Sequence, residues 1–201
     1  CKMQAVILAA GKSTRTYPLT ITKPKPLLKA AINTLLEHNL DNLKGIVDEV
    51  VIVGGYKKNM IKKHLGNKYK TLKIRYVEQK QQLGTGHAAL LTEHFVKDRF
   101  ILMAGDDIYC RRDMKNSVEH RYSILVNKSK NWKNFGVVIE KNGALSDFVE
   151  KPEKFVSDLV NTACYVLDKE IFKSLHEIKK SKRNEYELPD ALKLLSKNHR
   201  I

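Results

Sequence analysis

A glycine turn and two nearby cations form the clearest chemical pattern in this chain of 201 residues. The apolar residues 5–10 predict a buried strand, and Gly11 ends the run where a ligand could approach the backbone closely. The N–H groups of residues 12–14 and the guanidinium of Arg15 would then face phosphate oxygens. Lys25, fixed between two prolines, would add a second cation from another direction. This convergence favours a nucleoside triphosphate as ligand over an ordinary strand–loop–helix junction.

A second polar group follows the predicted strand at residues 72–77. Gln79 carries an amide that both donates and accepts hydrogen bonds, which matches the imide edge of a pyrimidine. Gly84 and Thr85 come directly before the next predicted helix, and a base could lie against the bare backbone of Gly84. Because α/β folds bind ligands at the carboxyl ends of strands, we expect a base-binding loop here. For His87 we expect an ordinary hydrogen-bonded histidine in the first helical turn.

Two aspartates, Asp106 and Asp107, follow the predicted strand at residues 99–104. A carboxylate in this position can hold Mg²⁺, which binds few protein groups and keeps several waters. Aspartates also commonly cap ordinary loops, so the pair by itself fits a loop cap as well as a metal site.

Four later residues have the chemistry of a sugar phosphate site. Glu150 and Asn161 can hydrogen-bond the hydroxyl groups of a pyranose, and Lys151 can contact a phosphate. Gly136 would let one face of the sugar approach the backbone. A surface ion pair between neighbouring side chains is the alternative for Glu150 and Lys151.

The segments 8–15, 18–20 and 23–26 together resemble the signature of the sugar-1-phosphate nucleotidylyltransferases. The resemblance continues through the L-G-T-G-H-A element at residues 83–88. This element is most similar to the uridylyltransferases that make UDP-N-acetylglucosamine. The chain as a whole resembles the N-terminal domains of these enzymes and of glucose-1-phosphate thymidylyltransferases. Ser13 and Ala163 stand where the family commonly has glycine.

The resemblance implies a reaction and a role for each matching residue. A pyrimidine nucleoside triphosphate, UTP or dTTP, and a sugar 1-phosphate would give a nucleotide sugar and diphosphate, with Mg²⁺ as the cofactor. The implied residues are Arg15 and Lys25 for catalysis, Leu8, Ala10, Gly11, Gln79, Gly84 and Thr85 for the nucleotide, Gly136, Glu150, Lys151 and Asn161 for the sugar phosphate, and Asp106 for the metal.

Two other functions stay open on the sequence. One is a cytidylyltransferase for a phosphorylated alcohol, against which the Glu150 and Asn161 elements argue. The other is a regulatory domain that binds a nucleotide sugar without turnover, which the departures at Ser13, Asn33 and Ala163 leave open.

Composition narrows the choice of partners and compartment. Lysine and arginine number 37 against 22 acidic residues, a net charge of +15, and the cations are spread along the chain in pairs typical of solvated helix faces. No aromatic-rich or zinc-based module accompanies the charge, so we expect phosphorylated small molecules and no nucleic acid. No apolar run approaches the roughly 20 residues that span a bilayer, and we expect neither a membrane partner nor a signal peptide. The three scattered cysteines predict reduced thiols in a cytoplasmic protein, and a homo-oligomer is compatible with the sequence.

The order of the predicted elements indicates an α/β fold. Strands and helices alternate in the first half, which predicts a Rossmann-like, doubly wound and mainly parallel sheet. Strands dominate residues 122–167 and predict an antiparallel extension that binds the sugar, whereas residues 177–187 predict a lysine-rich loop. We expect one nucleotidylyltransferase domain over residues 1–201, truncated at its C-terminus, because the family places a second metal ligand after a further strand. The predicted strands are 4–9, 49–53, 72–77, 99–104, 122–126, 136–140, 145–150 and 161–167, and the predicted helices are 34–43, 58–65, 86–95, 169–178 and 187–197.

Overall fold

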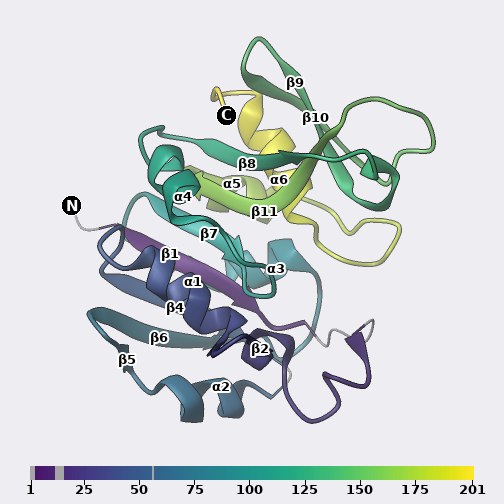
Figure 1. The fold of residues 1–201 in the computed structure, drawn as a ribbon. Coiled ribbons are helices and arrows are strands. Elements are labelled where there is room, and N and C mark those ends of the chain that lie inside the picture. The colour runs from purple at the N-terminus through teal and green to yellow at the C-terminus, as the bar shows by residue number, and fades with distance from the viewer. Residues whose placement is uncertain (1–2, 12–15, 56) are drawn as a thin grey trace.

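The computed structural model describes residues 3–11, 16–55 and 57–201. Within them the strands form a nine-stranded sheet in the order β10-β9-β11-β7-β1-β4-β6-β5, and β8 pairs with β11 (Figure 1). β1 (Gln4–Ala9) pairs in parallel with β4 (Glu49–Gly54) on one side and with β7 (Phe100–Ala104) on the other. β4 also pairs in parallel with β6 (Leu72–Glu78). The chain therefore runs outwards from β1 to β6 and returns to the opposite side of β1, which confirms the predicted doubly wound arrangement.

The strands beyond β7 are antiparallel, also as predicted. β11 (Leu159–Leu167) pairs antiparallel with β7, with β8 (Ser123–Lys128) and with β9 (Gly136–Lys141). β9 pairs in turn with β10 (Ala144–Glu150), and Figure 1 shows these two strands projecting at the top of the molecule. The short strands are β5 (Lys68–Tyr69) at the far edge and β2 (Lys29–Ala30) and β3 (Asn33–Thr34), which pair with each other.

The helices begin and end close to the predicted positions. A capping box starts α1: the Thr34 hydroxyl accepts from the N–H of Glu37 at 3.2 Å, and the Thr34 N–H donates to the Glu37 carboxylate at 2.8 Å. The helices are α1 (Leu35–Leu43), α2 (Lys58–Leu65), α3 (Thr85–Leu90), α4 (Arg111–Ser117), α5 (Glu170–Glu177) and α6 (Leu188–Ser196), with 3₁₀ turns at Lys25–Leu27 and Trp132–Asn134.

Two helices differ from the prediction. The helix expected over residues 86–95 ends at Leu90, and the hydroxyl of Thr92 donates to the carbonyl of Ala89 at 2.7 Å, a local bond that competes with the helical pattern. α4 was not predicted, because Met114 is its one buried residue and a single apolar side chain gives no helical period.

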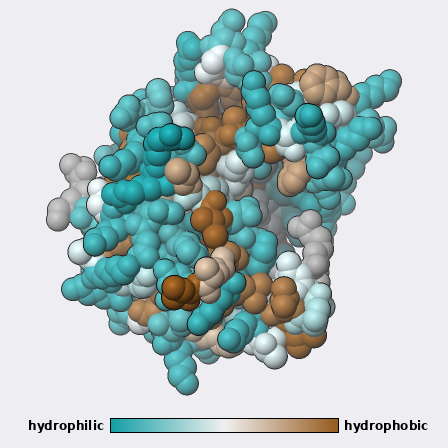
Figure 2. Space-filling model, viewed as in Figure 1, coloured by the Kyte–Doolittle hydropathy of each residue, from teal (hydrophilic) through white to brown (hydrophobic). Residues whose placement is uncertain are grey.

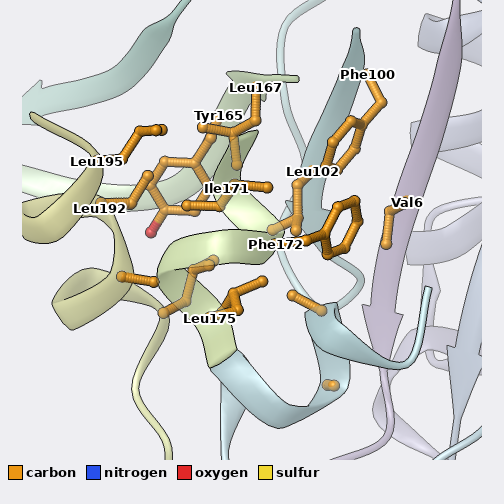
Figure 3. Packing of buried hydrophobic residues seen from close by; sticks show 14 of the residues in the cluster. Val6, Phe100, Leu102, Tyr165, Leu167, Ile171, Phe172, Leu175, Leu192 and Leu195 are labelled. Carbon is orange, nitrogen blue, oxygen red and sulfur yellow. The ribbon is translucent and has the colours of Figure 1, made fainter. Parts of the chain in front are cut away.

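Alternate residues of β1 pack against different layers of the fold. Val6 joins a cluster with residues of α3, α5 and α6, whereas Ala5 and Ile7 join a cluster with residues of α1 and α2 on the other face. Figure 3 shows the first cluster, in which the rings of Phe100 and Phe172 stack with centroids 5.9 Å apart. With apolar layers on both faces, the carboxyl ends of the parallel strands form a rigid platform for the loops that follow them.

Charged and polar side chains dominate one face of the molecule (Figure 2). Figure 2 shows one face that is largely hydrophilic, with apolar side chains gathered in small separate groups. Across the described residues, no helix combines the length and the apolar character needed to cross a membrane.

Candidate active site

A cavity of about 390 Å³ opens where β1 ends. β4 lies on one side of β1 and β7 on the other, so the strand order reverses at β1. Open α/β sheets usually bind their ligands at such a point. Eight of the residues predicted from the sequence line this cavity. They are Leu8, Ala10, Gly11, Gln79, Gly84, Thr85, Asp106 and Asn161.

The remaining predicted residues lie elsewhere. Lys25 is at the start of the 3₁₀ turn whose next residue, Pro26, lines the cavity. Gly136 begins β9, Glu150 ends β10 and Lys151 follows it, and none of the three lines this cavity. Arg15 falls outside the described residues.

Lys25 and Asp106 form an ion pair at the edge of the cavity. The Lys25 ammonium lies 2.9 Å from Oδ2 of Asp106, and the two side chains are 24% and 42% exposed. Asp106 follows β7, and the N–H of Gly105 donates to the carbonyl of Leu8 at 2.8 Å, which ties the aspartate loop to the end of β1. The pair thus places one cation and one carboxylate beside the predicted nucleotide loop.

Asp107, the residue after Asp106, has a carboxyl group with a raised pKa. Partial desolvation raises the pKa of the Asp107 carboxyl, and the negative charge of Asp106 raises it further. Its backbone carbonyl accepts from Nδ2 of Asn39 at 2.7 Å, so the main chain of this loop is held even though the Asp107 side chain is exposed.

Further hydrogen bonds that the sequence did not suggest hold the same loop. Nδ2 of Asn42 donates to the carbonyl of Tyr109 at 2.9 Å, and the Tyr109 hydroxyl donates to the carbonyl of Thr162 at 2.7 Å. The second bond connects the aspartate loop to the part of β11 that carries Asn161. The sequence offered one sign of these bonds, because Asn39, which bonds the carbonyl of Asp107, interrupts an otherwise apolar face of α1.

The loop predicted to bind the base is held by backbone hydrogen bonds to the segment that precedes α6. The N–H of Gly86 donates to the carbonyl of Tyr186, and the N–H of Tyr186 donates to the carbonyl of Leu83, both at 2.8 Å. This pairing brings Glu185 and Glu187 to the cavity wall. The sequence predicted only a loop over residues 177–187. The two glutamates in this otherwise lysine-rich stretch were the sequence feature that could have indicated its place in the cavity wall.

The predicted sugar residues form a second group beside the cavity. Gly136 and Glu150 are paired across β9 and β10, and a Cβ atom at Gly136 would lie 2.8 Å from Oε2 of Glu150. Glycine at this position therefore leaves room for the Glu150 carboxylate. Val137, the residue after Gly136, pairs with Val160, the residue before Asn161. The strand pairing therefore brings Gly136 and Glu150 near Asn161.

Asn161 lies at a bulge in β11. Its Oδ1 accepts from the N–H of Ala163 at 3.0 Å, and its Nδ2 donates to the Tyr165 hydroxyl at 2.7 Å. Ala163 has a φ of 55°, in the left-handed region that favours glycine. The glycine that the family commonly has at this position therefore matches the backbone better than the alanine found here.

Asp106 is a suitable but solitary ligand for a metal ion. Among the described residues, no group of three or more His, Cys, Asp or Glu side chains could hold a metal by itself. One carboxylate in the cavity wall, beside the predicted phosphate loop, fits Mg²⁺, which is commonly bound through one or two carboxylates, substrate phosphates and water.

These features define an α/β domain with a cavity at the point where the strand order reverses. The family model described as nucleotidyl transferase matches residues 4–200, and the chain belongs to this family. The family resemblance predicted from the sequence is thereby confirmed, and members of the family generally depend on a divalent metal ion.

Individual relatives agree with this assignment. The chain is 36% identical over 200 residues to the bifunctional protein GlmU of Methanocaldococcus jannaschii, covering 99% of this chain and 48% of that protein. It is 34% identical over 207 residues to the UTP–glucose-1-phosphate uridylyltransferase AglF of Haloferax volcanii, covering 98% of this chain and 85% of that protein. The chain thus spans about half the length of the GlmU relatives that it matches.

The fold also has a solved counterpart. A UDP-glucose pyrophosphorylase complexed with UDP-glucose superimposes with a TM-score of 0.86 at 25% identity, covering all of this chain and 89% of that one. The predicted α/β class is confirmed by this match.

Proposed function

We propose that this chain transfers a nucleotidyl group from UTP or dTTP to a sugar 1-phosphate, forming a nucleotide sugar and diphosphate. The observation that carries the proposal is the cavity at the end of β1, whose wall combines the glycine turn, Gln79, Asp106 and Asn161. Family membership supports the reaction, and the printed activity of the Haloferax volcanii relative supports a uridylyl transfer to a sugar phosphate.

The proposed chemistry is a direct displacement at phosphorus. A phosphate oxygen of the sugar 1-phosphate attacks the α-phosphorus of the nucleotide, a new P–O bond forms, and the bond between the α- and β-phosphates breaks. Diphosphate leaves with the electron pair, and no covalent enzyme intermediate is needed. Catalysis then rests on positioning and on neutralising the charge of two phosphorylated substrates.

The cations have separate tasks in this mechanism. Lys25 would bridge the two reacting phosphates once its ammonium leaves Asp106, and its contact with this cavity-lining residue supports the assignment. Arg15 is proposed to hold the triphosphate and the departing diphosphate. When Mg²⁺ is bound, Asp106 would hold it, and the ion would neutralise charge on the phosphate oxygens.

The remaining predicted residues would position the two substrates. We assign Leu8, Ala10, Gly11, Gln79, Gly84 and Thr85 to the nucleotide and Gly136, Glu150, Lys151 and Asn161 to the sugar phosphate. The Glu150 carboxylate, open beside Gly136, would accept hydrogen bonds from sugar hydroxyl groups. A cytoplasmic location and a homo-oligomeric state are further proposals, and the unpaired Cys110 and Cys164 fit a reducing compartment.

Diphosphate release tests the proposal and its alternatives. The chain is mixed with Mg²⁺, each of UTP, dTTP, CTP, ATP and GTP, and one of glucose 1-phosphate, N-acetylglucosamine 1-phosphate or a phosphorylated alcohol, and binding of a UDP-sugar is measured separately. Release with UTP or dTTP and a sugar phosphate supports the proposal. Release only with CTP and a phosphorylated alcohol would indicate the cytidylyltransferase, and binding of UDP-sugar without any release would indicate a regulatory domain.

A matched pair of variants tests the metal ligand. Asp106→Asn is expected to abolish Mg²⁺-dependent release, whereas Asp107→Asn at the neighbouring exposed carboxylate is expected to retain most of it. Full activity of Asp106→Asn at low Mg²⁺ would show that another residue holds the ion.

A further inference from the structure

We propose that His87 is a positioning residue that holds the Gln79 amide with its oxygen available to the base, so that the site selects uracil or thymine over cytosine. The inference rests on the proposed function, because it takes the cavity to be a pyrimidine nucleotide site. It adds a residue that sequence reasoning treated as an ordinary helical histidine.

The carbonyl of Gly84 identifies which terminal atom of the Gln79 amide is the nitrogen and which is the oxygen. Nε2 of Gln79 lies 3.0 Å from the carbonyl oxygen of Gly84. A carbonyl oxygen can only accept a hydrogen bond, so the amide nitrogen must face it, and an amide oxygen in its place would repel it. The orientation of this side chain therefore follows from the backbone of the base loop.

His87 engages the second hydrogen of the same amide nitrogen. Nε2 of Gln79 also lies 3.0 Å from Nδ1 of His87, in the first turn of α3. Since the amide nitrogen donates, Nδ1 must accept, and the imidazole proton lies on Nε2 of His87. Burial lowers the pKa of His87, which favours the neutral ring that this bond requires.

Only the oxygen of the Gln79 amide is then left for a ligand. Gln79 is 3% exposed and lines the cavity, and within the described part of the chain no group donates to its Oε1. The amide that can in principle donate and accept is thus committed as an acceptor. This differs from the dual role that the sequence suggested for Gln79.

An acceptor at this position distinguishes the pyrimidine bases. N3 of uracil and of thymine carries a hydrogen and can donate to Oε1, whereas N3 of cytosine carries a lone pair that would face the Oε1 lone pairs. Buried polar groups left unpaired in this way commonly give strong discrimination between ligands. The amide could serve cytosine only by turning over, which would oppose its oxygen to the Gly84 carbonyl and cost the bond to His87.

Two substitutions at position 87 separate the acceptor from the packing. His87→Leu fills a similar volume without an acceptor, and His87→Asn places an amide oxygen at the position of Nδ1. Without the acceptor, one N–H of Gln79 loses its partner in a buried site and the amide is free to turn. We expect His87→Leu to weaken UTP binding about tenfold and to reduce the preference for UTP over CTP by a similar factor. We expect His87→Asn to restore most of both.

The measurement is the dissociation constant of the chain for UTP and for CTP, each with Mg²⁺, by isothermal titration calorimetry. Melting temperatures of both variants confirm that they are folded. A loss of UTP affinity and of the preference for UTP over CTP in His87→Leu, with recovery of both in His87→Asn, supports the inference. Equal UTP and CTP affinities of the unmodified chain would overturn it, as would an unchanged UTP preference in His87→Leu or an equal loss in both folded variants.

Failure of the proposed function gives a different result. A chain that binds none of UTP, dTTP and CTP would contradict both the proposed function and this inference. A chain that binds UTP and releases diphosphate with a sugar phosphate, but is insensitive to position 87, would retain the proposed function and lose only the role of His87.

Discussion

The ammonium nitrogen of Lys25 lies 2.9 Å from the Asp106 carboxylate, although 81 residues separate the two in the chain. The contact joins the proline-flanked turn before α1 to the loop after β7, and both side chains are partly exposed. An ion pair this accessible to water adds little to stability, about 0–1 kcal/mol. Its significance is positional, since it holds a cation and a carboxylate where phosphates and a metal ion would meet.

Lys25→Ala is therefore expected to affect turnover far more than folding. The charge matters most when the two phosphates approach each other, so kcat should fall about 10²-fold or more while KM for the nucleotide rises less. Steady-state diphosphate release measures both parameters. Lys29→Ala, at an exposed lysine in the same segment, is the matched control and should behave as the unmodified chain. Near-normal turnover of Lys25→Ala would remove this lysine from the mechanism.

Gly84→Ala is expected to disturb the wall of the base pocket. Gly84 has a φ of 103°, and a Cβ atom there would lie 2.8 Å from the backbone nitrogen of Tyr186. Backbone strain and overlap with the neighbouring segment should together lower the free energy of unfolding by about 3 kcal/mol. The nucleotide dissociation constant should rise as well, because the segment that carries Glu185 and Glu187 must move.

Gly66→Ala provides the matched control for this substitution. Gly66 also has a positive φ, 65°, but a Cβ atom there meets no atom within 4 Å. The control should therefore show only the strain of a backbone conformation, with ψ at −154°, that is almost restricted to glycine, about 2 kcal/mol in urea unfolding. Equal losses in the two variants would mean that the contact with Tyr186 is not what Gly84 preserves.

Ala163→Gly is expected to stabilise the chain. Ala163 adopts a φ of 55° at the bulge of β11, and glycine has no Cβ to strain there. The relief exceeds the extra backbone freedom of glycine in the unfolded state, so we expect a gain of about 0.5 kcal/mol in urea unfolding. Ala144→Gly, in β10, lacks a positive φ and should instead lose up to about 1 kcal/mol. A loss of stability in Ala163→Gly would contradict the strain assigned to this bulge.

Asp168 is expected to contribute stability that disappears in acid. Burial alone would raise the pKa of the Asp168 carboxyl, but hydrogen bonds from the Tyr122 hydroxyl, the Glu170 N–H and the Arg121 guanidinium outweigh it and hold the pKa below 3.8. A carboxyl whose pKa is lower in the folded chain stabilises the fold above its unfolded pKa, about 3.9. This contribution is lost as the pH falls through the lower folded value.

Replacing Asp168 with asparagine tests this linkage. The free energy of unfolding of Asp168→Asn should be lower by about 1–2 kcal/mol at pH 7, and the difference from the unmodified chain should shrink below pH 4. Urea unfolding across the pH range measures it, with Glu153→Gln at an exposed carboxylate as the control. A difference that stays constant down to pH 2 would show that the charge of Asp168 is not responsible.

The sequence by itself determined the fold class and most of the secondary structure. The runs that became β1, β4 and β7 are almost continuously apolar, which is what burial on both faces of a parallel sheet requires, whereas β6, nearer the sheet edge, alternates apolar and charged residues at its start. Motifs such as the glycine turn and Gln79 were also legible, because each depends on a few adjacent residues. Local periodicity and local chemistry are properties of neighbouring residues, so they can be read without knowing the fold. α4, with a single buried residue, carried no such period.

Only the tertiary structure decided which of these residues meet. It placed Asn161 in the cavity but Gly136 and Glu150 beside it, and it brought Glu185 and Glu187 from an expected loop to the cavity wall. The same holds for the two contacts on which the proposals depend, Lys25 with Asp106 and Gln79 with His87. Distances of this kind depend on how helices and loops pack across the sheet, and the packing is a cooperative result of the whole chain that no single segment encodes.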